Sequence, residues 1–247
     1  MSFYPVTLNL ENRICLVVGG GRVAARKVAG LCRGGASVRL ISAEIVDEIR
    51  PWIAGHEGCT PVEWFNRNYA LGDLQDVFLA FAATSDPAVQ REIVDEARRR
   101  GVMLNVCDDP EASGFHVPAH FRRGGILVSV STGAQSPALA ALLRGRLEGV
   151  IGPEYDLVNR LLGAVRRALL AVGGSAEENG RVLHKLMESG IVEKILQGEW
   201  FQIQQILCTI LPETVDGAKL TADFVEEGEG IGLIRPLSLR AFSKPNS

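Results

Sequence analysis

Residues 17–28 read VVGGGRVAARKV, and this stretch decides the fold. Within it, Gly19, Gly21 and Ala24 follow the pattern G-x-G-x-x-A, between a short apolar run and a segment with helical spacing. A strand, a glycine loop and a helix in this order form the context that a dinucleotide-binding fingerprint requires. Gly19 permits the tight turn, Gly21 lets the backbone approach a pyrophosphate, and Ala24 lets helix and strand pack closely. A bare glycine turn is the alternative, and the complete βαβ frame speaks against it.

The start of the helix and the end of the next strand supply further candidate cofactor contacts. Helix N-termini present N–H donors and a partial positive charge to phosphates, so Arg22 and Val23 join the glycines. About 20 residues on, where an acidic residue usually binds the ribose, the chain has Ser42, with Glu44 two residues later. Because no arginine cluster adjoins Ser42 to bind a 2′-phosphate, we expect NAD in preference to NADP.

Strand and helix signals alternate along the first part of the chain. We expect strands at 13–18, 38–42, 60–64, 76–84 and 102–106, and helices at 22–33, 43–54 and 86–101. This alternation predicts an α/β fold with a Rossmann-type, doubly wound parallel sheet. Thr84, in the turn AATSD after an apolar strand, is another candidate cofactor contact, and a helix cap beside Asp86 is its equal alternative.

The periodicity changes after this part of the chain. We place the Rossmann domain at 1–112, a small α+β section at 113–150 and a helical domain at 151–211. Within the α+β section, we expect a strand at 125–133 and a helix at 136–151. Residues 212–247 are rich in Gly, Glu and Pro, and we expect a partly disordered tail there.

Composition excludes several classes of protein. The chain has 247 residues, of which 47% are hydrophobic and 22% charged, and its net charge of −3 gives no basic footprint for nucleic acid. Five scattered cysteines without a CxxC motif suit a reducing compartment. No signal-like N-terminus and no apolar run of 18 residues is visible, so we expect a cytoplasmic protein that does not contact membranes.

Residues 105–121 read NVCDDPEASGFHVPAHF and resemble a set of metal ligands at first sight. His116 and His120 are four residues apart, but Pro118 between them argues against a helix that would bring them together. In an extended segment, they would stand about 13 Å apart, too far for one ion. As strand neighbours, Cys107 and Asp108 face opposite ways. We therefore expect no permanent metal site.

Several motifs in the same order resemble one known family. YPVTLNLENRICLVVGGGRVAARKV, then AATSD, then NVCDDPEASGFHVPAHFRRGGILVSVSTGAQSPALAALLRGRLE look like the precorrin-2 dehydrogenase module of siroheme synthases, over residues 4–150. The resemblance implies that the protein oxidises precorrin-2 to sirohydrochlorin and passes two electrons to NAD+. It also implies a homodimer in which 113–150 is a dimerisation section, and some members insert Fe²⁺ as well.

The resemblance assigns roles to individual residues. Asp108 matches the family's catalytic carboxylate, and Ser131 matches a serine in the tetrapyrrole cleft. A carboxylate at the end of a strand beside the nucleotide is well placed to accept the proton that dehydrogenation releases. Asn105, on the same strand end, is a candidate for holding the cofactor or the base, and Asp109 before Pro110 is expected to form a turn.

The substrate carries many carboxylates, which arginine forks match. We therefore include Arg122 and Arg144 as candidate substrate contacts, with solvated surface positions as the alternative. His116 stands where the family usually has an apolar residue, so it is a substrate-facing proton donor, a transient iron contact, or a surface or satisfied histidine. Three alternatives to the dehydrogenase remain open: an enzyme that also chelates iron, a non-catalytic tetrapyrrole- or nucleotide-binding protein, and an oxidoreductase with another substrate.

Overall fold

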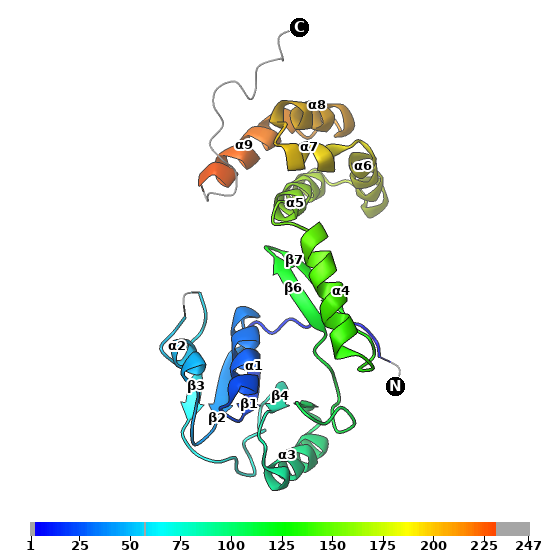
Figure 1. Ribbon diagram of the computed structural model, residues 1–247. Coiled ribbons are helices and arrows are strands. Elements are labelled where there is room, and N and C mark those ends of the chain that lie inside the picture. Colours follow the sequence, from blue (N-terminus) through cyan, green and yellow to red (C-terminus); the bar gives the residue numbers. More distant parts are fainter. Residues whose placement is uncertain (1–2, 57, 231–247) are drawn as a thin grey trace. The chain divides into compact units, whose positions relative to one another are not determined.

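The structure, a computed structural model, describes residues 3–56 and 58–230 and divides into two compact units (Figure 1). The first unit comprises the described residues up to 117 together with 133–135. The second unit comprises 118–132 and the described residues from 136 onwards. Each unit has its own hydrophobic core.

A five-stranded parallel sheet forms the centre of the first unit, with strand order β3-β2-β1-β4-β5. Its elements are β1 (Ile14–Val18), α1 (Arg22–Arg33), β2 (Ser37–Ile41), α2 (Arg50–Ile53), β3 (Glu63–Phe65), β4 (Leu79–Ala82), α3 (Pro87–Arg100) and β5 (Met103–Val106). The prediction of a doubly wound parallel sheet is confirmed. The strand order reverses between β1 and β4, and such sheets bind ligands at the carboxyl ends of their strands at this point.

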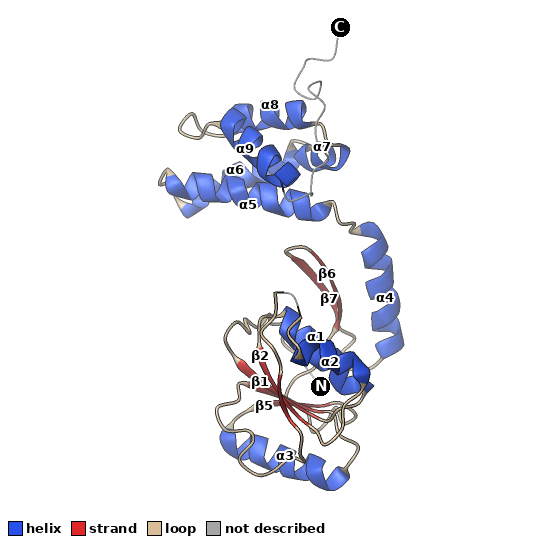
Figure 2. Cartoon of the chain, turned by 90° about the vertical axis from the view of Figure 1, so that its left-hand side faces the viewer, coloured by secondary structure: helices blue, strands red, loops and turns tan. Residues whose placement is uncertain are grey.

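Helices cover both faces of this sheet, which explains why β1 and β4 are apolar throughout. Figure 2 shows α1 and α2 on one side of the sheet and α3 on the other. Val28 and Leu31 of α1 pack with Val17 and Phe81 on the first face. Ile93 of α3 belongs to the core on the opposite face.

The helix expected at 43–54 is much shorter than predicted. A 3₁₀ turn at Asp47–Ile49 leads into the single turn of α2. The residues before it fold back onto the glycine loop, because Val46 donates its backbone N–H to the carbonyl of Gly20 at 2.9 Å. The hydroxyl of Ser42 donates to the carbonyl of Glu44 at 2.6 Å, which fixes this turn in a non-helical form.

The second unit begins with an antiparallel hairpin of β6 (Ala119–Arg123) and β7 (Ile126–Val130), followed by α4 (Pro137–Val150). The sequence predicted β7 and α4 but not β6. Gly124 and Gly125 connect the two strands, and Gly124 has a φ of 52°. The N–H of Gly125 donates to the buried carboxylate of Asp156 at 2.9 Å, so the hairpin is tied to the helices that follow.

Five helices complete the second unit: α5 (Tyr155–Ala171), α6 (Ala176–Glu188), α7 (Ile191–Gln197), α8 (Trp200–Ile210) and α9 (Gly217–Gly230). The expectation of a tail from residue 212 was wrong for α9, whose Phe224 and Val225 lie in the helical core. Residues 231–247, the rest of the expected tail, lie outside the described residues. In the part of the chain that the structure describes, no helix is long and apolar enough to span a membrane.

Candidate functional site

The three glycines after β1 differ in what a side chain at each position would meet. Gly19 has a φ of 118°, and a Cβ there would collide with the carbonyl of Ala83 after β4. A Cβ on Gly20 would collide with the carbonyl of Glu44. No described atom lies within 4 Å of the position that a Cβ on Gly21 would take. The fold itself therefore requires Gly19 and Gly20, whereas at Gly21 the space is open for a ligand.

The N-terminus of α1 is suited to an anion. Gly21 is its N-cap, no side chain caps it, and no acidic residue lies in its first turn. At α3, in contrast, the carboxylate of Asp86 accepts hydrogen bonds from Ala88 and Val89. The first N–H groups of a helix need an acceptor, and a pyrophosphate supplies one. The open space at Gly21 and the uncapped helix fit a dinucleotide.

Two other predicted cofactor residues have partners within the protein. The Ser42 hydroxyl, at the end of β2, donates to Glu44 and keeps its lone pairs available as acceptors. The hydroxyl of Thr84 accepts from the backbone N–H of Asp86 at 3.2 Å. Thr84 therefore supports the entry into α3, as its structural alternative predicted, while Asp86 is the N-cap itself.

Asp108 lies just beyond the carboxyl end of β5, and its side chain is exposed. The side-chain amide of Gln90, in the first turn of α3, donates to Oδ1 of Asp108 at 2.9 Å. The same nitrogen donates to the carbonyl of Thr84 at 2.7 Å. Because Ala83 also abuts Gly19, a continuous set of contacts leads from the glycine loop to Asp108.

Asn105 and Asp109 shape the loop around Asp108. Asn105 is buried, and its amide donates to the carbonyl of Phe115 at 3.0 Å. The carboxylate of Asp109 accepts from the backbone N–H groups of Glu111 and Ala112, which is the turn that the sequence predicted. Both side chains therefore hold the segment after β5 in place, and the amide nitrogen of Asn105 is directed toward this segment.

Lys27, which was not among the predicted site residues, also lies near the end of β5. The ammonium of Lys27 stands 4.9 Å from the ring centre of Phe81, and burial lowers the pKa of Lys27. Burial raises the pKa of the neighbouring Cys107 thiol, and the positive charges of Lys27 and Arg26 counteract part of this rise. Lys27 shares the inward face of α1 with Val28, so a lysine in an otherwise apolar helix face was the available signal.

The two histidines of the loop are arranged differently from each other. His120 is exposed on β6, and its Nδ1 lies 2.9 Å from the carbonyl of Pro118. The ring of His116 is half-buried with its centre 4.6 Å from that of Phe3, and its Nε2 is buried without a hydrogen-bond partner among the described residues. Within the same described part of the chain, no group of three or more His, Cys, Asp or Glu residues could hold a metal ion.

The remaining candidate substrate contacts belong to the second unit. Ser131 follows β7 and is exposed, as is Arg122 on β6. Arg144 on α4 forms an ion pair with Glu148 at 2.5 Å. Arg123 approaches the same carboxylate at 3.4 Å, so Glu148 is shared by two arginines. Of the two arginines predicted to bind the substrate, Arg122 therefore has the side chain that is open to solvent.

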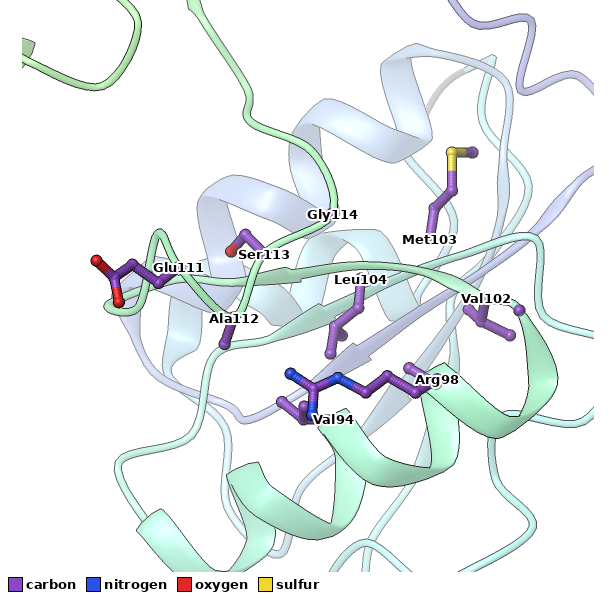
Figure 3. Close-up of a pocket in the computed structure, with 11 residues that line it drawn as sticks. Val94, Arg98, Val102, Met103, Leu104, Glu111, Ala112, Ser113 and Gly114 are labelled. Atoms are coloured by element: carbon purple, nitrogen blue, oxygen red, sulfur yellow. The ribbon is translucent and has the colours of Figure 1, made fainter. Parts of the chain in front are cut away.

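A cavity of about 460 Å³ lies between α3 and the edge strand β5 (Figure 3). Val94 and Arg98 of α3 line one side, Leu104 of β5 another, and the loop with Ala112 and Gly114 a third. None of the lining residues belongs to the glycine loop. This cavity is therefore a feature of the sheet edge, distinct from the nucleotide site.

Comparison with known proteins agrees with this geometry. Residues 6–119 match the protein family described as "Putative NAD(P)-binding". Siroheme synthase 1 of Serratia proteamaculans is 32% identical over 245 residues, which is 97% of this chain and 50% of that protein. The siroheme synthase of Nitrosomonas europaea is 34% identical over 87% of this chain and 45% of that protein.

A solved structure shares the fold. The chain called "SirC, precorrin-2 dehydrogenase" superposes with a TM-score of 0.68 at 24% sequence identity, and the match covers 83% of this chain and 98% of that one. At this identity, the likeness shows the fold alone.

The parallel sheet with its glycine loop and uncapped α1 defines a dinucleotide-binding protein of the Rossmann type. Within this class, the chain is a homologue of the siroheme synthases. It spans about half the length of the relatives it matches.

Proposed function

We propose that the protein is an NAD-dependent dehydrogenase that oxidises precorrin-2 to sirohydrochlorin in siroheme biosynthesis. The observation that carries this proposal is the position of Asp108 at the carboxyl end of β5, linked by contacts through Thr84 and Ala83 to the glycine loop. The solved structure of the same fold is called a precorrin-2 dehydrogenase, and the relatives are siroheme synthases. Both names support precorrin-2 as the proposed substrate.

Oxidation of precorrin-2 removes a hydride from one atom and a proton from another. When bound, a nicotinamide would supply the hydride acceptor. The chain must then supply a base within hydrogen-bond reach of the proton that leaves. Oδ1 of Asp108 accepts from Gln90, and among the described residues no hydrogen bond reaches Oδ2. We assign the proton to Oδ2 of Asp108.

The choice of NAD rests on the surroundings of Ser42. Arg39, the nearest arginine along β2, forms an ion pair with Glu63 at 3.4 Å. Arg22 at the start of α1 is exposed and lies 3.9 Å from Glu48. The acidic partners of both arginines disfavour the 2′-phosphate of NADP.

Each unit by itself carries cations that suit a substrate with many carboxylates. Lys27 and Arg26 act electrostatically on Cys107, the residue before Asp108, so positive charge lies close to the proposed base. Arg122 is exposed on β6 of the second unit. A tetrapyrrole with many carboxylates would be attracted to such groups.

We further propose that the protein forms a homodimer through the section that contains α4 and β7. Leu139, Leu142, Leu147 and Val150 of α4 are 38–71% exposed. Their spacing places them on one face of the helix, and Leu127 of β7 is also exposed. A monomer would leave this apolar face in water, whereas a symmetric pair buries it twice.

An anaerobic assay tests the activity. Purified protein, precorrin-2 and NAD+ should yield NADH and sirohydrochlorin in equal amounts, and NADP+ in place of NAD+ should give a lower kcat/KM. The same mixture without the protein serves as the control for both products. No NADH above that control would refute the dehydrogenase, and a preference for NADP+ would refute the cofactor assignment alone.

A further inference from the structure

We propose that Gln90 is a positioning residue that holds Asp108 in its reactive orientation. This inference rests on the proposed function, because it assigns a purpose to a contact with the proposed base. The side chains of Gln90 and Asp108 come from different elements, 18 residues apart in the sequence. The nitrogen of one amide reaches both Oδ1 of Asp108 and the backbone carbonyl of Thr84.

The chemistry of the two partners fixes the orientation of the amide. The carbonyl of Thr84 can only accept, and an ionised Asp108 can also only accept. Both must therefore face the NH₂ end of Gln90, which has two N–H bonds, one for each partner. The opposite orientation would place the amide oxygen against two other oxygens.

The anchor of this contact is rigid. Gln90 lies in the first turn of α3, where its own backbone N–H donates to the carbonyl of Asp86 at 3.0 Å. Asp86 in turn caps the helix through Ala88. Thr84 is the second residue after the end of β4, so Gln90 ties the carboxylate of Asp108 to the end of this strand. Side chains that are held by secondary structure keep catalytic groups at more accurate positions than loops do.

Asp108 needs such an anchor because its side chain is exposed after the end of β5. An exposed aspartate samples several rotamers, and only some of them direct Oδ2 toward the substrate. A hydrogen bond to Oδ1 selects a subset of these rotamers and leaves Oδ2 to accept the proton. Because small errors in the position of a reacting group reduce the rate strongly, loss of the contact should reduce kcat.

The first test replaces Gln90 by a side chain of similar length that cannot donate. Gln90→Met should lower kcat about 10- to 100-fold. It should leave the KM for NAD+, the KM for precorrin-2 and the thermal midpoint within the range of the control. The control is Gln75→Met, the same substitution at an exposed glutamine outside the site. An unchanged kcat would refute the inference. A lower kcat accompanied by a higher KM and a lower thermal midpoint would indicate a structural role and would also refute it.

A second variant gives a readout that a purely structural residue would not produce. Gln90→Glu places a carboxyl group against Asp108, and two close carboxyl groups share a proton as the pH falls. The shared proton restores a donor between them. The ratio of the variant's kcat to that of the wild type should therefore rise from about pH 8 to about pH 6. A ratio that does not change with pH would contradict the inference.

Crystal structures of the wild type and of Gln90→Met test the role of Gln90 independently of the proposed function. If the wild-type protein turns over precorrin-2, the kinetic tests decide. If it does not, the proposed function is refuted, and the side chain of Asp108 decides the role of Gln90. In crystals of Gln90→Met, Asp108 should occupy a different rotamer or several rotamers, whereas a single wild-type rotamer would refute the positioning role.

Discussion

At the residue scale, the glycines of the loop differ in their surroundings: two pack against the backbone, and the third faces open space. Gly19 and Gly20 lie against backbone carbonyls, so any side chain at either position displaces β4 or the turn after β2. Gly21 has no described neighbour within 4 Å of a Cβ and caps α1 with its φ of −82°. At Gly21, in contrast, the fold leaves room for a Cβ, and we propose that the bound cofactor is what requires glycine there.

We expect Gly21→Ala and Gly19→Ala to fail in different ways. Gly21→Ala should fold with a free energy of unfolding close to that of the wild type, but should bind NAD+ at least about tenfold more weakly because the methyl group occupies the pyrophosphate site. Gly19→Ala should lower the free energy of unfolding by about 2 kcal/mol or more, through its positive φ and the collision with Ala83. Urea denaturation and calorimetric titration with NAD+ measure both quantities. Equal NAD+ affinity in Gly21→Ala would contradict the placement of the pyrophosphate.

The residue scale also shows how far the sequence predicted the site. The glycine loop was predicted from a contiguous motif with fixed spacing, and Asp108 was selected through the resemblance to the family. Gln90 was not, because its role depends on the approach of the first turn of α3 to the end of β5, which no local pattern encodes. Lys27 was within the quoted motif, but its burial depends on the packing of α1 on the sheet.

At the scale of elements, α3 is held to the rest of the first unit by a buried carboxylate. Glu96 is 1% exposed. It accepts from the hydroxyl of Tyr69 at 2.5 Å, from the backbone N–H of Gly72 at 3.0 Å and from Arg100 at 2.5 Å. Burial by itself would raise the pKa of Glu96, but the hydrogen bonds outweigh burial and lower it.

This network makes the stability of the first unit depend on pH. A carboxyl group with a lowered pKa in the folded state stabilises that state above its unfolded pKa, near about 4.3, and loses this contribution as the pH falls through the folded pKa. Glu96→Gln should lower the free energy of unfolding at neutral pH by about 2 kcal/mol. The difference from the wild type should shrink below about pH 4. Urea denaturation across pH measures it, with the exposed Glu92→Gln on the same helix as control. A difference that stays constant with pH would contradict the account.

The elements themselves were predictable where local signals agreed. β1 and β4 are apolar runs, β5 is apolar except for Asn105, and α3 has an aspartate cap, a proline at its first position and Gly101 after its end. β6 was missed because AHFRR is short and half charged, and it is a strand only because it pairs with β7. α9 was missed because glycines and glutamates surround Phe224 and Val225, which become buried only through contact with the other helices.

At the scale of the whole molecule, the proposed dimer would bury the exposed apolar face of α4. Leu142 is 53% exposed and Val150 is 71% exposed, on a helix that packs with its other side on β6 and β7. A surface of this kind is uncommon on a monomer, because scattered apolar residues are ordinary but a continuous stripe is not.

If the proposed dimer forms, we expect Leu142→Glu to convert it to a monomer, because two like charges would be buried close to the symmetry axis or against apolar residues. Sedimentation velocity measures the change in mass. Leu71→Glu, at a residue that is 72% exposed in the first unit, is the control and should leave the mass unchanged. A wild-type protein that sediments as a monomer, or a Leu142→Glu variant that remains dimeric, would contradict the proposed interface.

We propose that the nucleotide site and Asp108 together carry out one dehydrogenation. The most direct measurement is a single-turnover reaction of precorrin-2 and NAD+ without oxygen, with wild-type protein and Asp108→Asn compared side by side. We predict that NADH and sirohydrochlorin appear together in the wild type. In the variant, their formation should slow by about 10²- to 10⁴-fold while NAD+ binding is retained. Equal rates in the two proteins, or no NADH from the wild type, would contradict the account.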